Sequence, residues 1–306
     1  MVNVFVTGGH GFLGKHLVRK LIEMDLNVTA PKSSEVDLRN ASSLGKYDKT
    51  SFDTIFHLAA WTQAGNFAAK YPGQQWINNQ LINTNMLTWW RERNPKAYFI
   101  SVGTSCSYSK DSSHEESQYL DGLPFEDLLT YGSTKRMLYI GQQSFEKEFK
   151  MKSLVAVPST LYGTGYEVSN RQPHFVFDLI KKSLDFKYYG KPIVIWGNGS
   201  QRRELVYVND FVDALVYLTQ IRYSGLINIA SGVEQEILYF LDIIKSVCGV
   251  DNAKVSFDLT AHVGVLSKQL NIDKLKRAMP EYKTSSFLRT LKETVSDIEV
   301  RYYKSD

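Results

Sequence analysis

Apolar side chains in the first half of the chain form short runs that alternate with longer amphipathic segments. The runs are rich in β-branched and aromatic residues, as is typical of buried strands, and they cover 2–7, 54–59, 97–102 and 154–157. After Phe12, apolar residues return every three or four positions from Leu13 to Ile22, which predicts a helix directly after the first strand. Strands that alternate with helices favour βαβ units, so the pattern predicts an α/β fold built on a doubly wound parallel sheet.

A second amphipathic segment, from Phe211 to Leu218, predicts a helix of the same layer, and either Asn209 or Asp210 could cap its N-terminus. The stretch 163–199 is rich in Gly, Pro, Asn and polar residues, and the last third of the chain has irregular short periodicities. Both features predict a smaller lobe. We expect a larger α/β domain over 1–160, to which 202–230 returns, and a smaller α/β lobe made of 161–201 and 231–306.

The composition is that of a folded protein. The chain has 306 residues, of which 43% are hydrophobic and 22% charged, which excludes the disordered, collagenous and coiled-coil classes. The net charge of +4 comes from scattered residues, so it gives no support to nucleic-acid binding but suits an anionic ligand. The two cysteines, Cys106 and Cys248, are too few for a disulfide framework or a cysteine-based metal site, and we expect no metal.

The sequence also bears on the compartment. Met1 is followed directly by the strand-like residues 2–6 rather than by a basic and then apolar leader. No run approaches the roughly 20 apolar residues that cross a bilayer. We therefore expect a cytoplasmic protein that does not bind membranes.

The first strand leads into a glycine motif that fits G-x-x-G-x-x-G. Glycine at these places permits a tight turn, lets backbone N–H groups approach a pyrophosphate and lets the helix pack on the strand. Because the motif joins the first strand to the first helix, it favours a Rossmann-like dinucleotide site over an ordinary glycine-rich turn. The candidate cofactor residues here are Gly8, His10, Gly11, Phe12, Leu13 and Gly14.

The end of the second strand bears on the choice of dinucleotide, because an acidic residue there would hold a free ribose 2′-hydroxyl. The segment 28–34 contains no acid, whereas Lys32 and His10 could receive a 2′-phosphate. This favours NADP(H) over NAD(H), although Lys32 would also be compatible with simple solvation. Asp37 follows where a loop could reach the adenine, or where an exposed acid needs no role.

Tyr131 and Lys135 form a Y-x-x-x-K motif, and residues four apart share one face of a helix. An ammonium beside a phenol favours phenolate, so we expect the pKa of Tyr131 to be lowered. Such pairs are common by chance. Together with the nucleotide loop and with the hydroxyl of Thr104 after the strand 97–102, this pair indicates a catalytic centre.

These residues together resemble the extended short-chain dehydrogenase/reductases, and most closely the branch that epimerises and reduces GDP-linked 4-keto-6-deoxyhexoses. The resemblance covers about residues 1–215. It rests on the glycine motif, His57-Leu58-Ala59-Ala60, Asn79, Asn85, the segment 104–108, Tyr131 with Lys135, the segment 158–163, His174, and Trp196-Gly197-Asn198-Gly199 with Arg203-Glu204.

The resemblance implies a role for each catalytic candidate. Tyr131 would give a proton to the reduced carbonyl, with Lys135 as its electrostatic partner and ligand of the nicotinamide ribose. Thr104 would hydrogen-bond the C4 oxygen of the sugar. Cys106 would remove a proton beside the C4 ketone and His174 would return one on the other face, because a ketone acidifies its α-hydrogens.

It likewise implies binding residues. Leu58, Ala59, Ala60 and Pro158 would contact the cofactor; Thr160 and Trp196 would contact the nucleotide sugar, and Lys182 and Arg203 its diphosphate. Roles without a ligand remain open for two of these residues: Lys182 could be solvated, and Arg203 could form an ion pair with Glu204. His57 is interpreted as structural. The chain departs from the family in three places, with Thr160 for Asn, Thr104 for Ser, and His10 with a shifted Lys32 for the usual arginines.

The function implied is NADPH-dependent reduction of a nucleotide-linked 4-keto-6-deoxyhexose, GDP-linked, with epimerisation at C3, C5 or both, by a homodimer. One alternative is reduction alone, if Cys106 is only a small buried apolar residue and His174 only satisfies backbone groups. A 4,6-dehydratase is opposed by Ser105-Cys106 in place of an acidic pair. A non-catalytic NADP(H) sensor or scaffold is opposed by the joint presence of Thr104, Tyr131 and Lys135.

Overall fold

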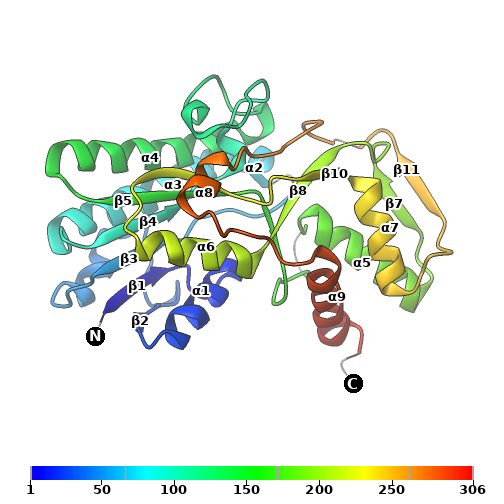
Figure 1. The fold of residues 1–306 in the computed structure, drawn as a ribbon, viewed down its shortest axis with the longest axis horizontal. Helices are drawn as coiled ribbons and strands as arrows, with labels where there is room; N and C mark the ends of the chain where they lie inside the picture. Colours follow the sequence, from blue (N-terminus) through cyan, green and yellow to red (C-terminus); the bar gives the residue numbers. More distant parts are fainter. Residues whose placement is uncertain (1, 66, 170–171, 262, 305–306) are drawn as a thin grey trace.

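In the computed structural model, which describes residues 2–65, 67–169, 172–261 and 263–304, two lobes lie side by side (Figure 1). The larger lobe is built on a six-stranded parallel sheet with the strand order β2-β1-β3-β4-β5-β9. Its strands are β1 (Asn3–Thr7), β2 (Asn27–Thr29), β3 (Thr54–His57), β4 (Tyr98–Val102), β5 (Ser153–Pro158) and β9 (Gly225–Ile229). The predicted doubly wound sheet is confirmed.

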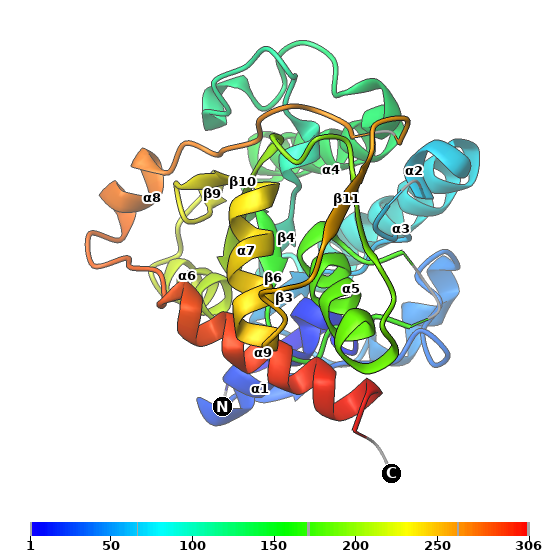
Figure 2. The same ribbon diagram turned by 90° about the vertical axis from the view of Figure 1, so that its right-hand side faces the viewer.

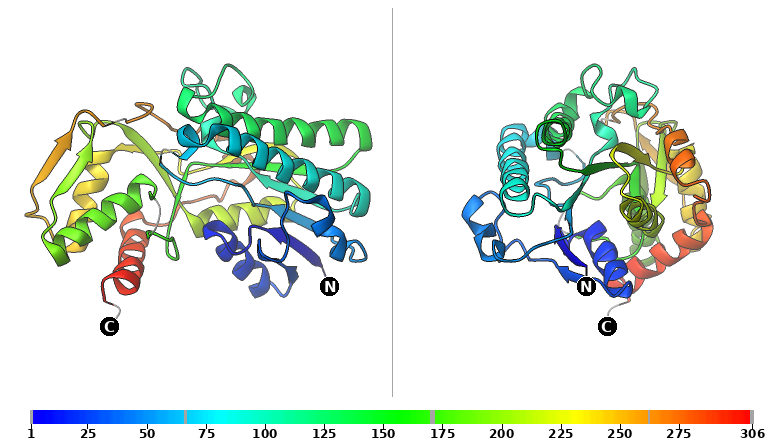
Figure 3. Two further views of the ribbon diagram at one scale, coloured as in Figure 1. Left: turned by 180° about the vertical axis from the view of Figure 1, so that it is seen from behind. Right: turned by 60° about the vertical axis from the view of Figure 1, so that its left-hand side comes forward.

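Helices cover both faces of this sheet. On one face lie α1 (Phe12–Glu23) and α6 (Val208–Gln220); on the other lie α3 (Pro72–Arg93) and α4 (Leu129–Phe149) (Figures 1 and 3). Every residue of β3 and β4 is buried. Burial on both faces explains why these strands read as continuous apolar runs rather than as an alternation.

The strand order reverses between β1 and β3. From β1 the chain moves outward to β2, and it then returns to pair β3 with the opposite edge of β1. In open α/β sheets, ligands bind beyond the carboxyl ends of the two strands at such a point. The glycine motif after β1 and the residues Leu58–Ala60 after β3 therefore meet at the expected crevice.

The smaller lobe combines a three-stranded sheet, β10-β8-β6, with a parallel pair, β11 and β7. Figure 2 shows α9 running across α7, with α5 beside them. The elements are β6 (Thr160–Tyr162), α5 (Phe175–Tyr189), β7 (Ile193–Trp196), β8 (Arg202–Tyr207), β10 (Glu234–Glu236), α7 (Ile237–Cys248), β11 (Val255–Asp258) and α9 (Phe287–Tyr302). A smaller C-terminal α/β lobe was predicted and is confirmed.

A late segment of the chain, around α8 (Asp273–Ala278), packs on the larger lobe although the predicted division assigns it to the smaller one. Its residues Leu270, Ile272 and Leu275 are buried in the same core as Leu226 of β9. The segment that precedes α8 consequently passes from one lobe to the other beside the sheet edge. The domain limits given above remain a prediction.

One predicted cap is wrong. The helix α6 begins at Val208 with Tyr207 at its N-cap, so Asn209 and Asp210 lie in its first turn. The Asp210 carboxylate accepts hydrogen bonds from the backbone N–H and the hydroxyl of Ser285, both at 2.7 Å. Its side chain therefore ties α6 to the chain before α9. No helix in the described ranges is long and apolar enough to cross a membrane.

Candidate active site

The glycine loop has the geometry of a dinucleotide site. Gly8 has a φ of +69°, and a methyl group there would lie 2.8 Å from the backbone nitrogen of Ala59; one at Gly14 would collide with the carbonyl oxygen of Gly8. These two glycines let α1 and β3 close on β1. Gly11 is exposed at the N-cap of α1, whose first turn has no side-chain cap. Such a helix N-terminus suits a pyrophosphate, so the residues present fit a dinucleotide.

Replacing Gly14 by alanine should therefore damage both folding and cofactor binding. The new methyl group would force the α1–β1 junction apart, and overpacking of this kind commonly destabilises by about 1–3 kcal/mol. Gly45→Ala is the matched control, because nothing lies within 4 Å of its added methyl group. Thermal unfolding measures the difference, and equal midpoints for the two variants would contradict it.

The region expected to receive a 2′-phosphate is exposed. His10 and Lys32 both lie at the surface, and His10 Nε2 is 2.9 Å from the carbonyl oxygen of Ala30. Asp37 is held by Arg39, whose Nε and Nη2 donate to its carboxylate at 2.9 and 2.8 Å. These bonds lower the pKa of Asp37. Arg39 is a second cation here that the sequence did not single out.

His57 has the structural role interpreted from the sequence. It is 1% exposed, with the Thr7 hydroxyl 2.9 Å from Nδ1 and the Asn83 amide oxygen 3.1 Å from Nε2. Burial, and then the charge of Lys135, lower the pKa of His57 to about 4. The neutral ring thus joins β1, β3 and α3 behind the crevice.

The Tyr131–Lys135 pair lies on the first turns of α4, which places both side chains on one face of the helix. Lys135 is buried, and its Nζ donates to the carbonyl oxygen of Val102 at 2.8 Å. Burial lowers the pKa of Lys135 to about 8, so the ammonium still predominates at pH 7. The cation is fixed at the carboxyl end of β4.

The expected lowering of the Tyr131 pKa is wrong for the protein alone. Burial raises the pKa of Tyr131, and the nearby Cys106 raises it further; the hydrogen bond with Thr104 opposes them only in part. The Lys135 ammonium is directed at Val102 instead. Tyr131 is consequently a protonated phenol at neutral pH, which is the form a proton donor needs.

Thr104 connects the two candidate acid–base groups. It caps the 3₁₀ turn Ser105–Ser107 after β4, where its hydroxyl oxygen accepts from the N–H of Cys106 at 3.2 Å. The same hydroxyl acts on both acid–base candidates, because it lowers the pKa of the Tyr131 phenol and that of the Cys106 thiol. A hydroxyl, a phenol and a thiol therefore converge at one point of the sheet edge.

Cys106 has the electrostatics of a reactive cysteine. It is half-buried, and Lys268 Nζ lies 3.0 Å from its Sγ. Burial opposes ionisation, but the charge and hydrogen bond of Lys268, the Thr104 hydroxyl and the charge of Arg203 outweigh it and lower the pKa of Cys106. These contacts argue against Cys106 as a small apolar filler. Lys268 was missed in the sequence because nothing in its local pattern points across 162 residues to Cys106.

The other predicted substrate residues lie in the smaller lobe or on its border. His174 is exposed at the N-cap of α5, with its backbone N–H 3.3 Å from the Tyr166 hydroxyl. Lys182 pairs with Asp178 at 2.6 Å and lies 5.8 Å from the ring centre of Trp196, which is 49% exposed. The three side chains Lys182, Trp196 and Asp178 thus form one surface on α5 and β7.

The structure describes both Arg203 and Glu204 and shows no ion pair between them, which was the alternative to a diphosphate-binding role for Arg203. The Arg203 guanidinium donates to the carbonyl oxygens of Val265 and Val263 at 2.8 and 3.1 Å. The Glu204 carboxylate accepts from the backbone of Leu270 at 2.9 Å and from Gly232. Burial raises the pKa of Glu204 to about 7. The two residues instead hold the chain segment that carries Lys268.

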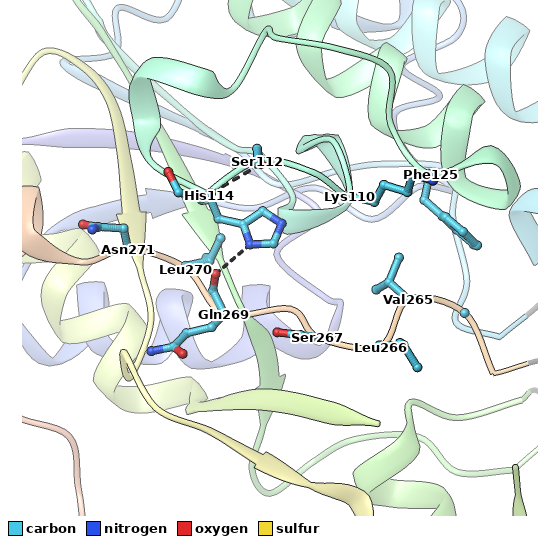
Figure 4. A pocket seen from close by; sticks show the side chains of 12 residues that line it. Lys110, Ser112, His114, Phe125, Val265, Leu266, Ser267, Gln269, Leu270 and Asn271 are labelled. Atoms are coloured by element: carbon cyan, nitrogen blue, oxygen red, sulfur yellow. Dashed lines mark hydrogen bonds between the residues drawn. The ribbon is translucent and has the colours of Figure 1, made fainter. Parts of the chain in front are cut away.

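The remaining candidates follow β5. Pro158 ends this strand and Thr160 begins β6, and both are half-buried. A cavity of about 660 Å³ opens between the loop after the 3₁₀ turn and the segment before α8 (Figure 4). His114 projects into it, with Nδ1 2.8 Å from the carbonyl oxygen of Gln269. Within the described ranges, His, Cys, Asp and Glu form no group of three that could hold a metal ion.

Comparisons with known proteins agree with this architecture. GDP-L-fucose synthase 1 of Arabidopsis thaliana is 28% identical over 286 residues, covering 89% of this chain and 85% of the relative. GDP-L-colitose synthase of Yersinia pseudotuberculosis is 26% identical, covering 88% and 89%. The crystal structure of a GDP-L-fucose synthetase from Naegleria fowleri bound to NADP superposes with a TM-score of 0.86 at 21% identity, covering 99% of this chain and 95% of that one.

The chain also matches the NAD dependent epimerase/dehydratase family over residues 4–230, from β1 to the end of β9. That span contains the glycine loop, the Thr104–Cys106 turn and the Tyr131–Lys135 pair. The resemblance drawn from the sequence is therefore confirmed, and the chain belongs to the NAD dependent epimerase/dehydratase family.

Proposed function

We propose that this protein reduces a GDP-linked 4-keto-6-deoxyhexose with NADPH, after epimerising the sugar at C3, C5 or both. One observation carries the proposal: Thr104 connects a phenol whose pKa is raised with a thiol whose pKa is lowered. Titratable neighbours whose pKa values are pushed apart are suited to act as acid and base. A 4-ketone beside them would need a proton donor for its oxygen and a base for its α-hydrogens.

In the reduction, Tyr131 gives its phenolic proton to the C4 oxygen while Thr104 hydrogen-bonds the same oxygen. Lys135, which shares a helix face with Tyr131 and donates to the carbonyl oxygen of Val102, would hold the nicotinamide ribose. Bound NADPH supplies the hydride. The protonated state of Tyr131 at neutral pH suits this role.

In the epimerisation, Cys106 takes a proton from a carbon beside the ketone, and the electron pair moves into an enolate. His174 returns a proton on the opposite face, which inverts the carbon. An acid and a base on two faces invert a centre that one group alone would only exchange. Loss of this pair of roles would leave a plain 4-reductase.

The cofactor would be held by the glycine loop and by the ends of β3 and β5, namely by Gly8, Gly11, Phe12, Leu13, Gly14, Leu58, Ala59, Ala60 and Pro158. Asp37 would meet the adenine, and His10 and Lys32 the 2′-phosphate. The relatives support the choice of cofactor, because the Naegleria fowleri structure contains NADP.

The nucleotide part of the substrate would lie on the smaller lobe. Lys182 and Arg203 would meet the diphosphate, and Trp196 and Thr160 the nucleoside side. Lys182 would reach the diphosphate from its present pair with Asp178. Both relatives named above make GDP-linked sugars, which supports GDP as the carrier.

Lys32→Glu should reverse the preference for NADPH over NADH, because a carboxylate repels a 2′-phosphate and accepts from a 2′-hydroxyl. Lys254→Glu, an exposed change of equal charge on the other lobe, is the control. Fluorescence titration with each cofactor gives the two dissociation constants. Equal affinities for both cofactors, unchanged by the substitution, would remove Lys32 from cofactor recognition.

We also propose a homodimer through α3 and α4. These neighbouring helices expose large apolar side chains: Trp76, Ile77 and Leu81 on α3, and Met137 and Ile140 on α4. A helix pair from each of two copies would bury them. Light scattering should give twice the mass of one chain, and a monomer at micromolar concentration would contradict the proposal.

The function is tested with a panel of GDP- and dTDP-linked 4-keto-6-deoxysugars, each with NADPH and with NADH. We expect rapid NADPH oxidation with a GDP-linked ketone and slower oxidation with the dTDP-linked sugars. Turnover with retained configuration at C3 and C5 would favour the 4-reductase. Binding of NADPH without oxidation by any ketone would favour a sensor or scaffold.

A further inference from the structure

We infer that Lys268 is a positioning residue that holds Cys106 as a thiolate, so that the base of this site is a thiolate–ammonium pair. The use of that pair in epimerisation rests on the proposed function. The pair itself rests on geometry within the protein alone.

The contact joins distant parts of the chain. Cys106 lies in the 3₁₀ turn after β4, and Lys268 lies in the segment before α8, yet Nζ and Sγ are 3.0 Å apart. The thiol is half-buried, so an adjacent charge acts on it through less water than at the open surface. An ammonium at this distance favours the charged form of a thiol.

The other groups that face Cys106 do not cancel this effect. Arg203 of β8 adds a second positive charge, and the Thr104 hydroxyl also lowers the pKa of the thiol. The neighbouring phenols of Tyr131 and Tyr119 both have a raised pKa and are neutral at pH 7. Among the described residues, Lys268 is the cation with the larger effect on the sulfur, ahead of Arg203.

Lys268 is not a free surface lysine. Its backbone N–H donates to the Glu234 carboxylate at 3.1 Å, and the adjacent Ser267 hydroxyl donates to the same carboxylate at 2.8 Å. Arg202 donates to Glu234 at 2.9 Å, which partly neutralises that carboxylate. Arg203 fixes the preceding carbonyl oxygens of Val263 and Val265.

These bonds form a strap, residues 263–268, that is tied to β8 and β10. Because the strap is fixed by its backbone, the Lys268 side chain reaches Cys106 without first having to order the chain. The strap also forms one wall of the cavity in Figure 4, through Val265, Leu266 and Ser267. Cys106 thus receives its cation from the lobe that is expected to bind the substrate.

In the proposed step, the Cys106 thiolate removes a proton from the carbon beside the ketone. The carbon–hydrogen bond beside the ketone breaks as a sulfur–hydrogen bond forms, and the freed electron pair moves to the enolate oxygen. Negative charge passes from Cys106 to the substrate, while Lys268 keeps its three protons throughout. A thiol without its cation would enter this step mostly protonated at pH 7, because an ordinary cysteine has a pKa of about 8.5.

The test is the pH dependence of iodoacetamide alkylation at Cys106, read peptide by peptide by mass spectrometry. The substrate-free protein suffices. Cys248 is the internal reference, since it is 1% exposed and burial raises its pKa to about 12. In the wild type we expect the alkylation midpoint of Cys106 to lie below about 8.5, the ordinary cysteine value.

Lys268→Met keeps an unbranched side chain that is one atom shorter, and it removes the charge. It should raise the midpoint by at least about one pH unit, which lowers the alkylation rate about tenfold at a pH well below the wild-type midpoint. Lys268→Arg should stay near the wild type. Lys276→Met, an exposed change of equal charge on α8, is the matched control and should leave the midpoint unchanged.

A wild-type midpoint at or above 8.5, or equal midpoints in the wild type and Lys268→Met, would overturn the inference. If Lys268→Met does not fold, the wild-type midpoint still decides. A lysine that only bound the diphosphate would change KM and leave the midpoint in place. A lowered midpoint without any solvent exchange into a sugar would reject the proposed epimerisation and retain the pair.

Discussion

Tyr131→Phe is expected to bind NADPH like the wild type and to lose hydride transfer by a factor of about 10²–10⁴, the usual contribution of a general acid. The substitution removes one hydroxyl group and leaves the ring in place. Because Tyr131 lies on α4 while the glycine loop follows β1, the cofactor site should keep its shape. The C4 oxygen would then have no phenolic proton to accept as the hydride arrives.

Stopped-flow oxidation of NADPH measures the rate, and cofactor fluorescence measures binding. Tyr139→Phe is the matched control on the same helix, because its hydroxyl contacts only the exposed Gln143 among the hydrogen bonds described for it. Turnover of Tyr131→Phe close to that of Tyr139→Phe, with normal folding, would remove Tyr131 from the mechanism.

Cys106→Ser is expected to slow the exchange of carbon-bound hydrogen with solvent about 10²-fold or more, because a serine hydroxyl is far less acidic than a thiol and far less ionised beside Lys268. The size of the side chain hardly changes. Tyr131, Thr104 and Lys135 stay in place, so direct reduction of the ketone can continue. The product should then retain the original configuration at the carbons beside C4.

Deuterium incorporation during turnover in D₂O, read by NMR, measures this exchange. Cys248→Ala is the control for the loss of a thiol, since Cys248 is buried at the end of α7, in the core of the smaller lobe. Wild-type deuterium content in the Cys106→Ser product would show that another group removes the proton.

The local motifs could be predicted from the sequence because each is built from residues close together in the chain. The glycine loop joins β1 to α1, the Thr104–Cys106 turn follows β4, and the Y-x-x-x-K pair lies within the first turns of α4. Their chemistry depends on backbone geometry that glycine content and helical spacing already specify. Lys268 could not be found in this way, since it reaches Cys106 only after the strap is tied to Glu234 and Arg203.

The helix α3 illustrates a different limit. Its buried face carries the polar residues Gln75, Asn79 and Asn83, while Trp76 and Ile77 are exposed. Apolar residues therefore fall on both sides, and no single stripe marks the helix. The amides are buried because Asn79 hydrogen-bonds the backbone of Trp61 and Asn83 accepts from His57. The tertiary contacts of α3 therefore explain its burial better than the spacing of its apolar residues does.

The predicted lowering of the Tyr131 pKa is wrong for a related reason. Spacing placed Lys135 on the same face, but it could not reveal that the ammonium would donate to Val102 and that the phenol would be buried beside Cys106. The raised pKa leaves Tyr131 protonated, which is compatible with the proposed role of proton donor, whereas the predicted lowering by Lys135 is wrong.

The most direct test of the proposed mechanism is the configuration and deuterium content of the wild-type product formed in D₂O from a GDP-linked 4-keto-6-deoxyhexose and NADPH. The mechanism predicts inversion at C3, C5 or both, with solvent deuterium on each inverted carbon and hydride from NADPH at C4. A reduced product with its original configuration and no deuterium at C3 or C5 would contradict epimerisation and leave a 4-reductase.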